Sequence, residues 1–220
     1  MNKTIFISFI SVLFFHCSSV SSTTILDEWK KNYNNDEYWY GLSIIDKKDQ
    51  ENIQKVAIVN NDGVLKIRMQ INKIFSGYRT FVDLYYTEKL VIIDVNEDAR
   101  IAADHTIQQD VLELKAQEGG ELKINAQVEQ LLIKTVTGGV IATTGSSDLQ
   151  DVAINTGGVY EGKELKTKFS TVNVNAGSRA EIYASDYVKA TVKAGGEVLV
   201  YGDPAKMDEK TVFGGTVTRM

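Results

Sequence analysis

Two glutamates are the residues of this sequence best spaced for acid–base chemistry. Glu161 and Glu181 each lie four residues after the start of a glycine turn. If successive turns stack as neighbouring strands, the two carboxylates would lie about 5 Å apart, a separation typical of a glycosidase acid and nucleophile. Lys163 and Arg179 are close enough in the sequence to balance both charges, and no long loops surround the pair. We therefore predict no catalytic residue and keep a polysaccharide-degrading enzyme, acting through these surface carboxylates, as the alternative.

A second candidate for proton transfer is His105, which directly follows Asp104. The pair could act as a general base, but no serine or cysteine nucleophile lies at motif spacing, so we predict a surface histidine in a turn. Beyond its first 22 residues the chain has one histidine and no cysteine. It therefore lacks the usual nitrogen and sulfur ligands of zinc. We predict neither a metal site nor a cofactor.

Three tyrosines are candidates for ligand binding. Tyr160, Tyr183 and Tyr201 recur in the second half of the chain, and a tyrosine offers an apolar ring with a polar tip. We expect that such a surface would contact envelope or host glycans or proteins. The alternative is that these rings pack against one another inside the fold.

Glycine turns recur through the same half of the sequence. Their first residues are 18 to 20 positions apart, a constant period that is typical of a solenoid. No turn is followed by the lysine and hydroxyl residue of a phosphate-binding loop, so we interpret the turns as corners. The six turns are Gly119-Gly120, Gly138-Gly139, Gly157-Gly158, Gly177-Ser178, Gly195-Gly196 and Gly214-Gly215.

Apolar residues flank each turn at fixed distances, with mostly polar residues between them. Three residues after each first glycine stand Leu122, Ile141, Tyr160, Ala180, Val198 and Val217, and five before the first five glycines stand Leu114, Ile133, Val152, Val172 and Ala190. This alternation is typical of short, half-buried strands. Constant spacing favours stacked coils over antiparallel hairpins, because equivalent positions must align between coils. We predict an all-β, parallel β-solenoid with coils of about 19 residues, each made of strand, turn, strand and return; a β-sandwich is the alternative.

The first 22 residues predict a secretory signal peptide. Lys3 precedes an apolar run from Ile5 to Phe15, and small residues follow before a cut after Ser22. Cys17, the only cysteine, offers a second interpretation as the acylated first residue of a lipoprotein. Phe15 and His16 depart from the small residues that such a signal prefers before its cysteine.

Composition indicates a folded, exported domain. The chain is 43% hydrophobic and 24% charged, with a net charge of −5. Its basic residues are scattered among acids, whereas nucleic-acid binding needs them clustered. We expect no nucleic-acid partner, and a membrane contact only through a lipid anchor; the composition does not indicate an oligomeric state.

We divide the chain into four segments. The signal peptide covers residues 1–22, an aromatic-rich cap residues 23–41, an N-terminal β region residues 42–89 and the regular coils residues 90–220. Asp62-Gly63 between two alternating runs predicts a hairpin in the third segment. Asp98 stands 21 residues before Gly119 and marks an earlier corner without glycine. We expect residues 42–220 to form one continuous domain.

The order of several short motifs resembles that of an exported bacterial family. The motifs are Tyr85-Tyr86, Lys89-Leu90, the first two glycine pairs, Leu165-Lys166-Thr167 and Val200-Tyr201-Gly202-Asp203-Pro204 before Gly214-Gly215. From roughly Leu42 to Thr218, the chain resembles the auto-transporter adhesin head domain, or head GIN domain, found typically in Bacteroidetes-like organisms. The resemblance implies a right-handed parallel β-solenoid of the bacterial envelope and implies no reaction.

Together, these features predict a non-enzymatic, exported protein with an adhesin-like solenoid that serves as a binding or spacer surface. Its expected location is the periplasm, the outer-membrane surface or the medium.

Overall fold

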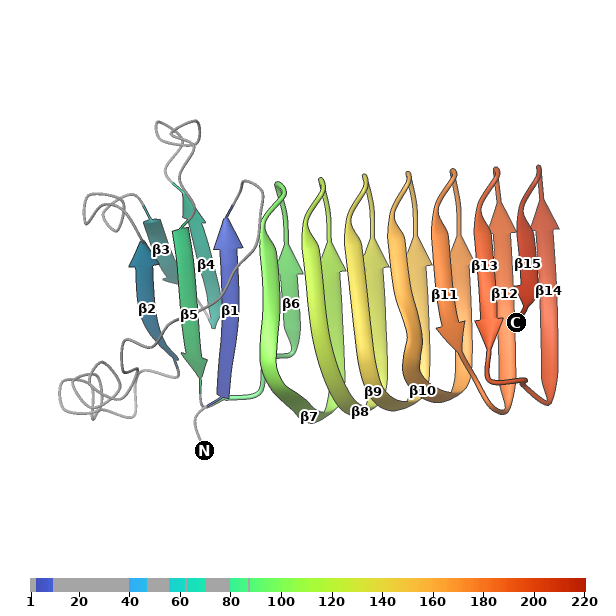
Figure 1. Ribbon diagram of the computed structural model, residues 1–220, viewed down its shortest axis with the longest axis horizontal. Coiled ribbons are helices and arrows are strands. Elements are labelled where there is room, and N and C mark those ends of the chain that lie inside the picture. Colours follow the sequence, from blue (N-terminus) through green and yellow to red (C-terminus); the bar gives the residue numbers. More distant parts are fainter. Residues whose placement is uncertain (1–2, 10–39, 47–55, 62, 70–79, 87) are drawn as a thin grey trace. The chain divides into compact units, whose positions relative to one another are not determined.

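The computed structural model describes residues 3–9, 40–46, 56–61, 63–69, 80–86 and 88–220. The regular elements in these ranges are all β-strands (Figure 1). The predicted cap before Tyr40, Cys17 and the second half of the predicted signal peptide lie outside the described residues. The chain divides into two compact units, Met1–Glu88 and Lys89–Met220.

In the first unit the strands pair antiparallel. β5 (Thr80–Tyr86) pairs with β1 (Lys3–Phe9) on one side and with β2 (Tyr40–Asp46) on the other. β3 (Val56–Asn61) and β4 (Val64–Met69) form a hairpin, which confirms the turn expected there. Gly63 in this turn has a φ of 76°, a conformation that glycine adopts without strain.

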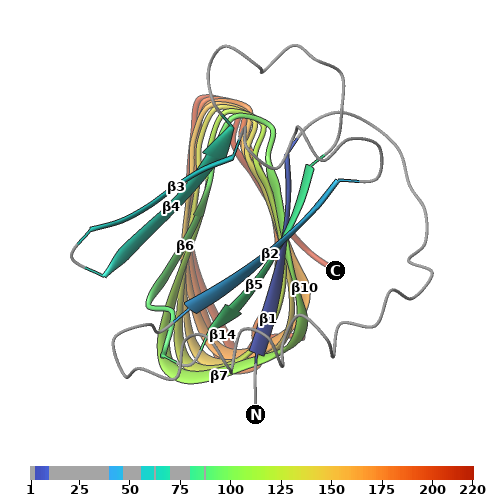
Figure 2. The same cartoon turned by 90° about the vertical axis from the view of Figure 1, so that its left-hand side faces the viewer.

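The second unit is a parallel β-solenoid. Its strands stack so that residues of equivalent position are neighbours, as shown by Leu114 beside Ile133 and Ile133 beside Val152. Viewed end-on, the coils superimpose as a flattened ring with two long sides (Figure 2). The predicted fold class is confirmed, and the sandwich alternative is wrong because the pairs between the coils are parallel rather than antiparallel. The strands of this unit are β6 (Ile92–Val95), β7 (Arg100–Ala116), β8 (Glu121–Thr135), β9 (Val140–Ile154), β10 (Val159–Val174), β11 (Arg179–Tyr183), β12 (Tyr187–Lys193), β13 (Glu197–Tyr201), β14 (Lys206–Val212) and β15 (Thr216–Arg219).

Four coils contain a single long strand instead of two strands and a return. β7, β8, β9 and β10 are 15 to 17 residues long and pass through the bend opposite the glycine corner without a break. At the bend two consecutive side chains face outward, for example Lys168 and Phe169 in β10. This doubling shifts the in–out alternation by one residue and lets both sides of the coil face the same core.

The core is built from columns of apolar side chains that run from coil to coil. Both sets of residues predicted to flank the turns lie in it: Leu122, Ile141, Tyr160, Ala180 and Val198 on one side, and Leu114, Ile133, Val152, Val172 and Ala190 on the other, are all at most 2% exposed. Val217 of the last strand is half-buried. Burial of these columns supplies the main stabilisation of the unit.

Each corner uses two consecutive residues with positive φ, and only the second of them is usually glycine. Thr156 and Gly157, for example, have φ values of 54° and 70°. Glu97 and Asp98 adopt the same geometry at 55° each, which confirms the expected corner without glycine. The corners also stack, since Gly138 N donates to Thr156 O at 3.1 Å.

Candidate ligand-binding surface

The two glutamates are neighbours, as their spacing predicts. Glu161 in β10 pairs in register with Glu181 in β11. The side chain of Glu181 is only 16% exposed and receives Arg179 Nη2 at 2.9 Å and Lys163 Nζ at 3.6 Å. Arg179 also reaches Glu197 at 3.5 Å. This network balances the charge of Glu181 instead of presenting a free acid and base to a substrate.

His105 lies in a strand and not in a surface turn, so that prediction is wrong. Its Nδ1 lies 2.8 Å from Asp104 Oδ1, and its side chain is 23% exposed. The register of β7 with β8 shifts between Ala102 and Thr106, so the pair lies in a strand irregularity. This shift interrupts the alternation that a sequence pattern can detect.

Tyr160 is part of the core and is not available to a surface ligand. The side chain is fully buried, and its hydroxyl bonds Thr143 Oγ1 at 2.7 Å and accepts from Gln150 Nε2 at 2.6 Å. Burial raises the pKa of this hydroxyl, and the hydrogen bond with Thr143 opposes the shift. Ser170 Oγ donates to Gln150 Oε1 at 3.2 Å, which extends a buried polar network across the coils.

Tyr183 and Tyr201 lie side by side on the outer face of the solenoid. They pair in register between β11 and β13, and both are half-buried. Lys166 Nζ lies 3.9 Å from the centroid of the Tyr183 ring, and the same ring packs against Gly202. Tyr183 therefore has part of its ring surface occupied by the protein itself.

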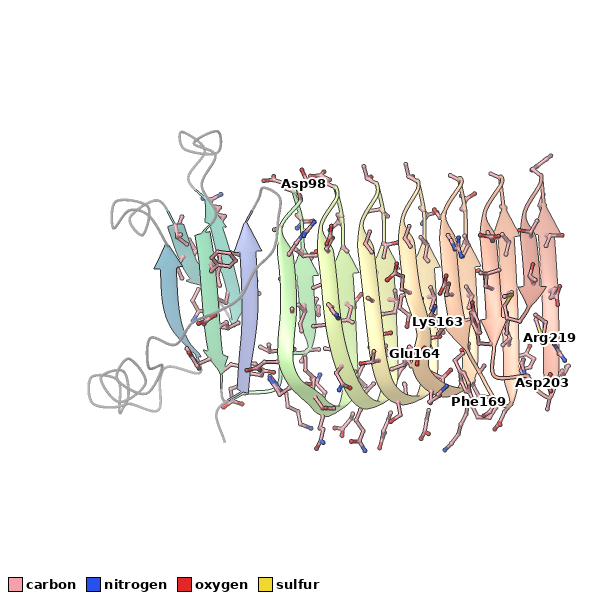
Figure 3. The ribbon with its side chains drawn as sticks, in the orientation of Figure 1. Asp98, Lys163, Glu164, Phe169, Asp203 and Arg219 are labelled. Atoms are coloured by element: carbon pink, nitrogen blue, oxygen red, sulfur yellow. The ribbon has the colours of Figure 1, made fainter. Side chains whose placement is uncertain are left out.

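The structure also shows a surface that the tyrosine prediction missed. We call it the bend row: one residue per coil at the bend, each in register with the next. Val111, Leu149 and Phe169 in this row are 42%, 45% and 42% exposed. In Figure 3 Phe169 lies at the edge where the coils bend, opposite the glycine-corner edge marked by Asp98. The members of the bend row are Val111, Gln130, Leu149, Phe169, Tyr187 and Lys206.

A row of charged residues lies directly beside the bend row, because both residues of each doubled position face outward. This flanking row consists of Asp110, Glu129, Asp148, Lys168 and Asp186. Lys168 Nζ pairs with Asp148 Oδ1 at 2.7 Å, and Lys89 Nζ pairs with Asp110 Oδ2 at 3.1 Å. The sequence carries a weak signal for both rows: a charged residue followed by an apolar or aromatic one recurs with nearly the coil period, with Gln130 as the exception.

The described residues hold no group of three or more histidine, cysteine, aspartate or glutamate side chains that could bind a metal ion. In the same part of the chain no helix could cross a membrane.

Comparisons with known proteins agree with this geometry. The family model described as putative auto-transporter adhesin, head GIN domain, matches residues 44–204. A putative adhesin of Bacteroides fragilis NCTC 9343 has a similar structure, with a TM-score of 0.62 at 13% identity, covering 82% of this chain and 97% of that one. A putative adhesin of Parabacteroides merdae ATCC 43184 gives 0.57 at 18% identity, covering 84% and 85%.

A third similar structure carries a different description. It is a putative lipid binding protein of Parabacteroides distasonis ATCC 8503, with a TM-score of 0.60 at 14% identity, covering 84% of this chain and 85% of that one. At these identities the three structures establish the fold alone. No curated protein matches the chain.

Proposed function

Because this chain belongs to the family of putative auto-transporter adhesins with a head GIN domain, we propose that it is a non-enzymatic, adhesin-like binding protein. The observation that carries this proposal is the bend row. Its exposed apolar side chains stand in one line, with Leu149 and Phe169 on consecutive coils and Val111 two coils before Leu149. An exposed apolar patch of this kind is often functional. The rigid core holds these side chains in fixed positions before any ligand arrives.

We prefer this proposal to a polysaccharide-degrading enzyme. A glycosidase needs two carboxyl groups that can both reach the substrate, whereas Glu181 is half-buried and held by Lys163 and Arg179. Both glutamates and the residues in register with them lie in strands, β10 and β11, and not in long loops that could wall a groove. A broad glycan panel on which the protein cleaves a substrate, and on which Glu161→Gln stops that cleavage without unfolding, would favour the enzyme instead.

Export completes the proposal. The predicted signal peptide would deliver the solenoid to the periplasm, the outer-membrane surface or the medium, where envelope or host glycans and proteins are available. The apolar run ending at Phe15 and the family of adhesins support this location.

The binding role can be tested by applying the purified protein to arrays of glycans and of envelope or host proteins. We expect a ligand whose signal falls in the double variant Leu149→Asn/Phe169→Asn. Thr171→Ala, a substitution in β10 outside the bend row, is the matched control and should bind like the unmodified protein. Failure to bind any ligand on either array would contradict the proposal.

A further inference from the structure

We propose that the bend row binds an uncharged, linear polysaccharide that lies along the solenoid axis. This inference rests on the binding function proposed above and specifies the ligand class. It follows from the spacing of the bend row, its small area, its side-chain chemistry and the charges beside it.

The spacing suits a linear polymer. Neighbouring strands lie about 4.8 Å apart, so the six members of the bend row span about 24 Å. Register pairs connect Leu149 to Phe169 and Phe169 to Tyr187, which keeps the row continuous. A polymer of sugar rings, whose repeat is of similar length, can present an equivalent face to successive coils.

The area of the row is too small for a second copy or a folded protein partner. A large aromatic side chain has a surface of about 150–250 Å², and Phe169 is 42% exposed. The whole row therefore offers a few hundred Å² at most, whereas a stable protein interface needs about 800 Å² from each partner. A narrow chain can use such a strip fully.

The side chains of the row match the two kinds of surface on a sugar ring. Phe169 and Leu149 offer apolar contacts to its C–H face. Gln130, whose Nε2 donates to Asp151 Oδ2 at 3.0 Å, can offer its amide oxygen to a sugar hydroxyl. The Tyr187 hydroxyl donates to Asp208 Oδ2 at 2.6 Å, which fixes the ring orientation. A ring held before binding loses little entropy when the ligand arrives.

The flanking row selects against negative charge. Four of its five residues are acidic. The lysines in and beside the two rows already pair with carboxylates: Lys168 with Asp148, Lys89 with Asp110 and Lys206 with Asp208. An anionic polymer would bring like charges together, which disfavours binding. Carboxylates such as Glu129 can instead accept hydrogen bonds from sugar hydroxyls.

Affinity electrophoresis in native gels tests this ligand class with the full folded protein. The neutral probes are hydroxyethyl cellulose, galactomannan and dextran, and the anionic probe is alginate. We expect at least one neutral polymer to retard the protein, alginate not to, and the retardation to persist at about 0.5 M NaCl because no ion pair carries the binding.

Variants place the binding on the bend row. Leu149→Asn/Phe169→Asn should weaken the apparent affinity about tenfold or more, since most of the apolar contact area is lost. Thr171→Ala should behave like the parent, and thermal unfolding should show that both variants are folded. Unchanged retardation of the double variant would overturn the assignment.

The other possible results of the electrophoresis also test the proposed ligand class. Retardation by alginate alone, or by none of the neutral polymers, overturns the ligand class. Binding to zwitterionic phosphatidylcholine vesicles in place of the neutral polymers overturns it as well. In each of these cases an array ligand that is lost in the double variant would still leave the broader binding function standing.

Discussion

At the scale of single residues, Tyr160 and Gly162 depend on each other. The Tyr160 ring occupies the space that a side chain at Gly162 would fill: a Cβ there would lie 2.4 Å from the Cε1 and Cζ atoms of the ring. The next coil solves the same packing problem with the opposite sizes, Ala180 and Ile182. The large residue thus stands at the first position in one coil and at the second position in the next, and the core stays filled in both coils.

We expect Gly162→Ala to destabilise the protein by about 1–3 kcal/mol, because the added methyl group overpacks a filled core. Urea unfolding of parent and variant measures the change. Tyr160→Ala/Gly162→Ile, which copies the next coil, should show a non-additive gain relative to the two single variants. Simple additivity would contradict the direct contact between the two positions.

Tyr160→Phe tests the buried hydrogen-bond network and its pH dependence. Removing the hydroxyl leaves Gln150 and Thr143 without this partner, at a cost of about 1–3 kcal/mol near neutral pH. In the parent, burial raises the pKa of Tyr160 above its unfolded value. The unfolded state therefore loses this proton first, and the stabilisation falls as the pH rises above about 10.

The measurement is unfolding free energy against pH for parent and variant. The gap between the two curves should be constant below the unfolded tyrosine pKa and should narrow at higher pH. A gap that widens with pH would contradict a raised pKa for Tyr160.

The sequence predicted the position of Tyr160 better than its role. The period of the glycine turns and the apolar parity placed it in a column with Ile141 and Ala180, and the structure confirms that column. A tyrosine at such a position still suggested a surface contact, because residue type alone does not show whether a hydroxyl has a buried partner. That information lay in Gln150 and Thr143, which reach it from the preceding coil.

At the scale of elements, the glycine pairs at the corners serve two different purposes. The first glycine, such as Gly138 with a φ of 73°, provides the backbone conformation. The second glycine provides space: a Cβ on Gly139 would lie 2.2 Å from Ala116 O of the preceding coil. The spacing of the glycines assigns both to the corner, but only the stacking of coils distinguishes their roles.

The residue before the first glycine also has a positive φ, which disfavours a β-branched side chain. Thr156 occupies this position with a φ of 54°. We expect Thr156→Asn to stabilise the protein by about 0.5–1 kcal/mol, because asparagine tolerates this conformation better. Thermal unfolding measures the gain.

Thr144→Asn is the matched control, since Thr144 is an exposed threonine in strand β9. It should be neutral or slightly destabilising, because asparagine is a weaker strand former. Equal effects at both positions would show that the corner conformation is not the cause.

The bend was the least predictable element. A strict period of two describes each side of a coil, but the doubled outward residues shift the phase where the sides meet, as at Asp148 and Leu149. In the four coils with one long strand, no proline or glycine pair marks this place, and β8 passes through it without a break. The bend row was missed for this reason. Its residues follow the alternation of an ordinary strand on each side, and only the folded coil shows that they lie at the bend.

At the scale of the whole molecule, repetition explains why the solenoid was predictable and the first unit was not. Each coil of Lys89–Met220 repeats the same pattern, so weak signals reinforce one another. The described strands before Glu88 form one antiparallel group of three and one hairpin, and the Gly63 hairpin alone carried a strong local signal. Function was less predictable than fold, because a repeated surface specifies spacing and leaves the ligand to a few exposed side chains.

The N-terminus presents the last prediction, because two roles compete for the same residues. Lys3–Phe9 pairs with β5, yet the apolar run that follows predicts removal of residues 1–22. We expect intact mass spectrometry of the protein from the cell envelope or medium to show a chain starting at Thr23, or at an acylated Cys17.

That processed chain lacks β1, so β5 keeps β2 and loses its partner on the other side. Amides of β5 that had bonded to β1 should then exchange faster than in the unprocessed chain, because an edge strand leaves such groups unpaired. Exchange in β8, which pairs with β7 and β9, should be the same in both forms and is the internal control. An envelope protein that retains Lys3–Phe9 would contradict the processing and would give those residues a permanent place beside β5.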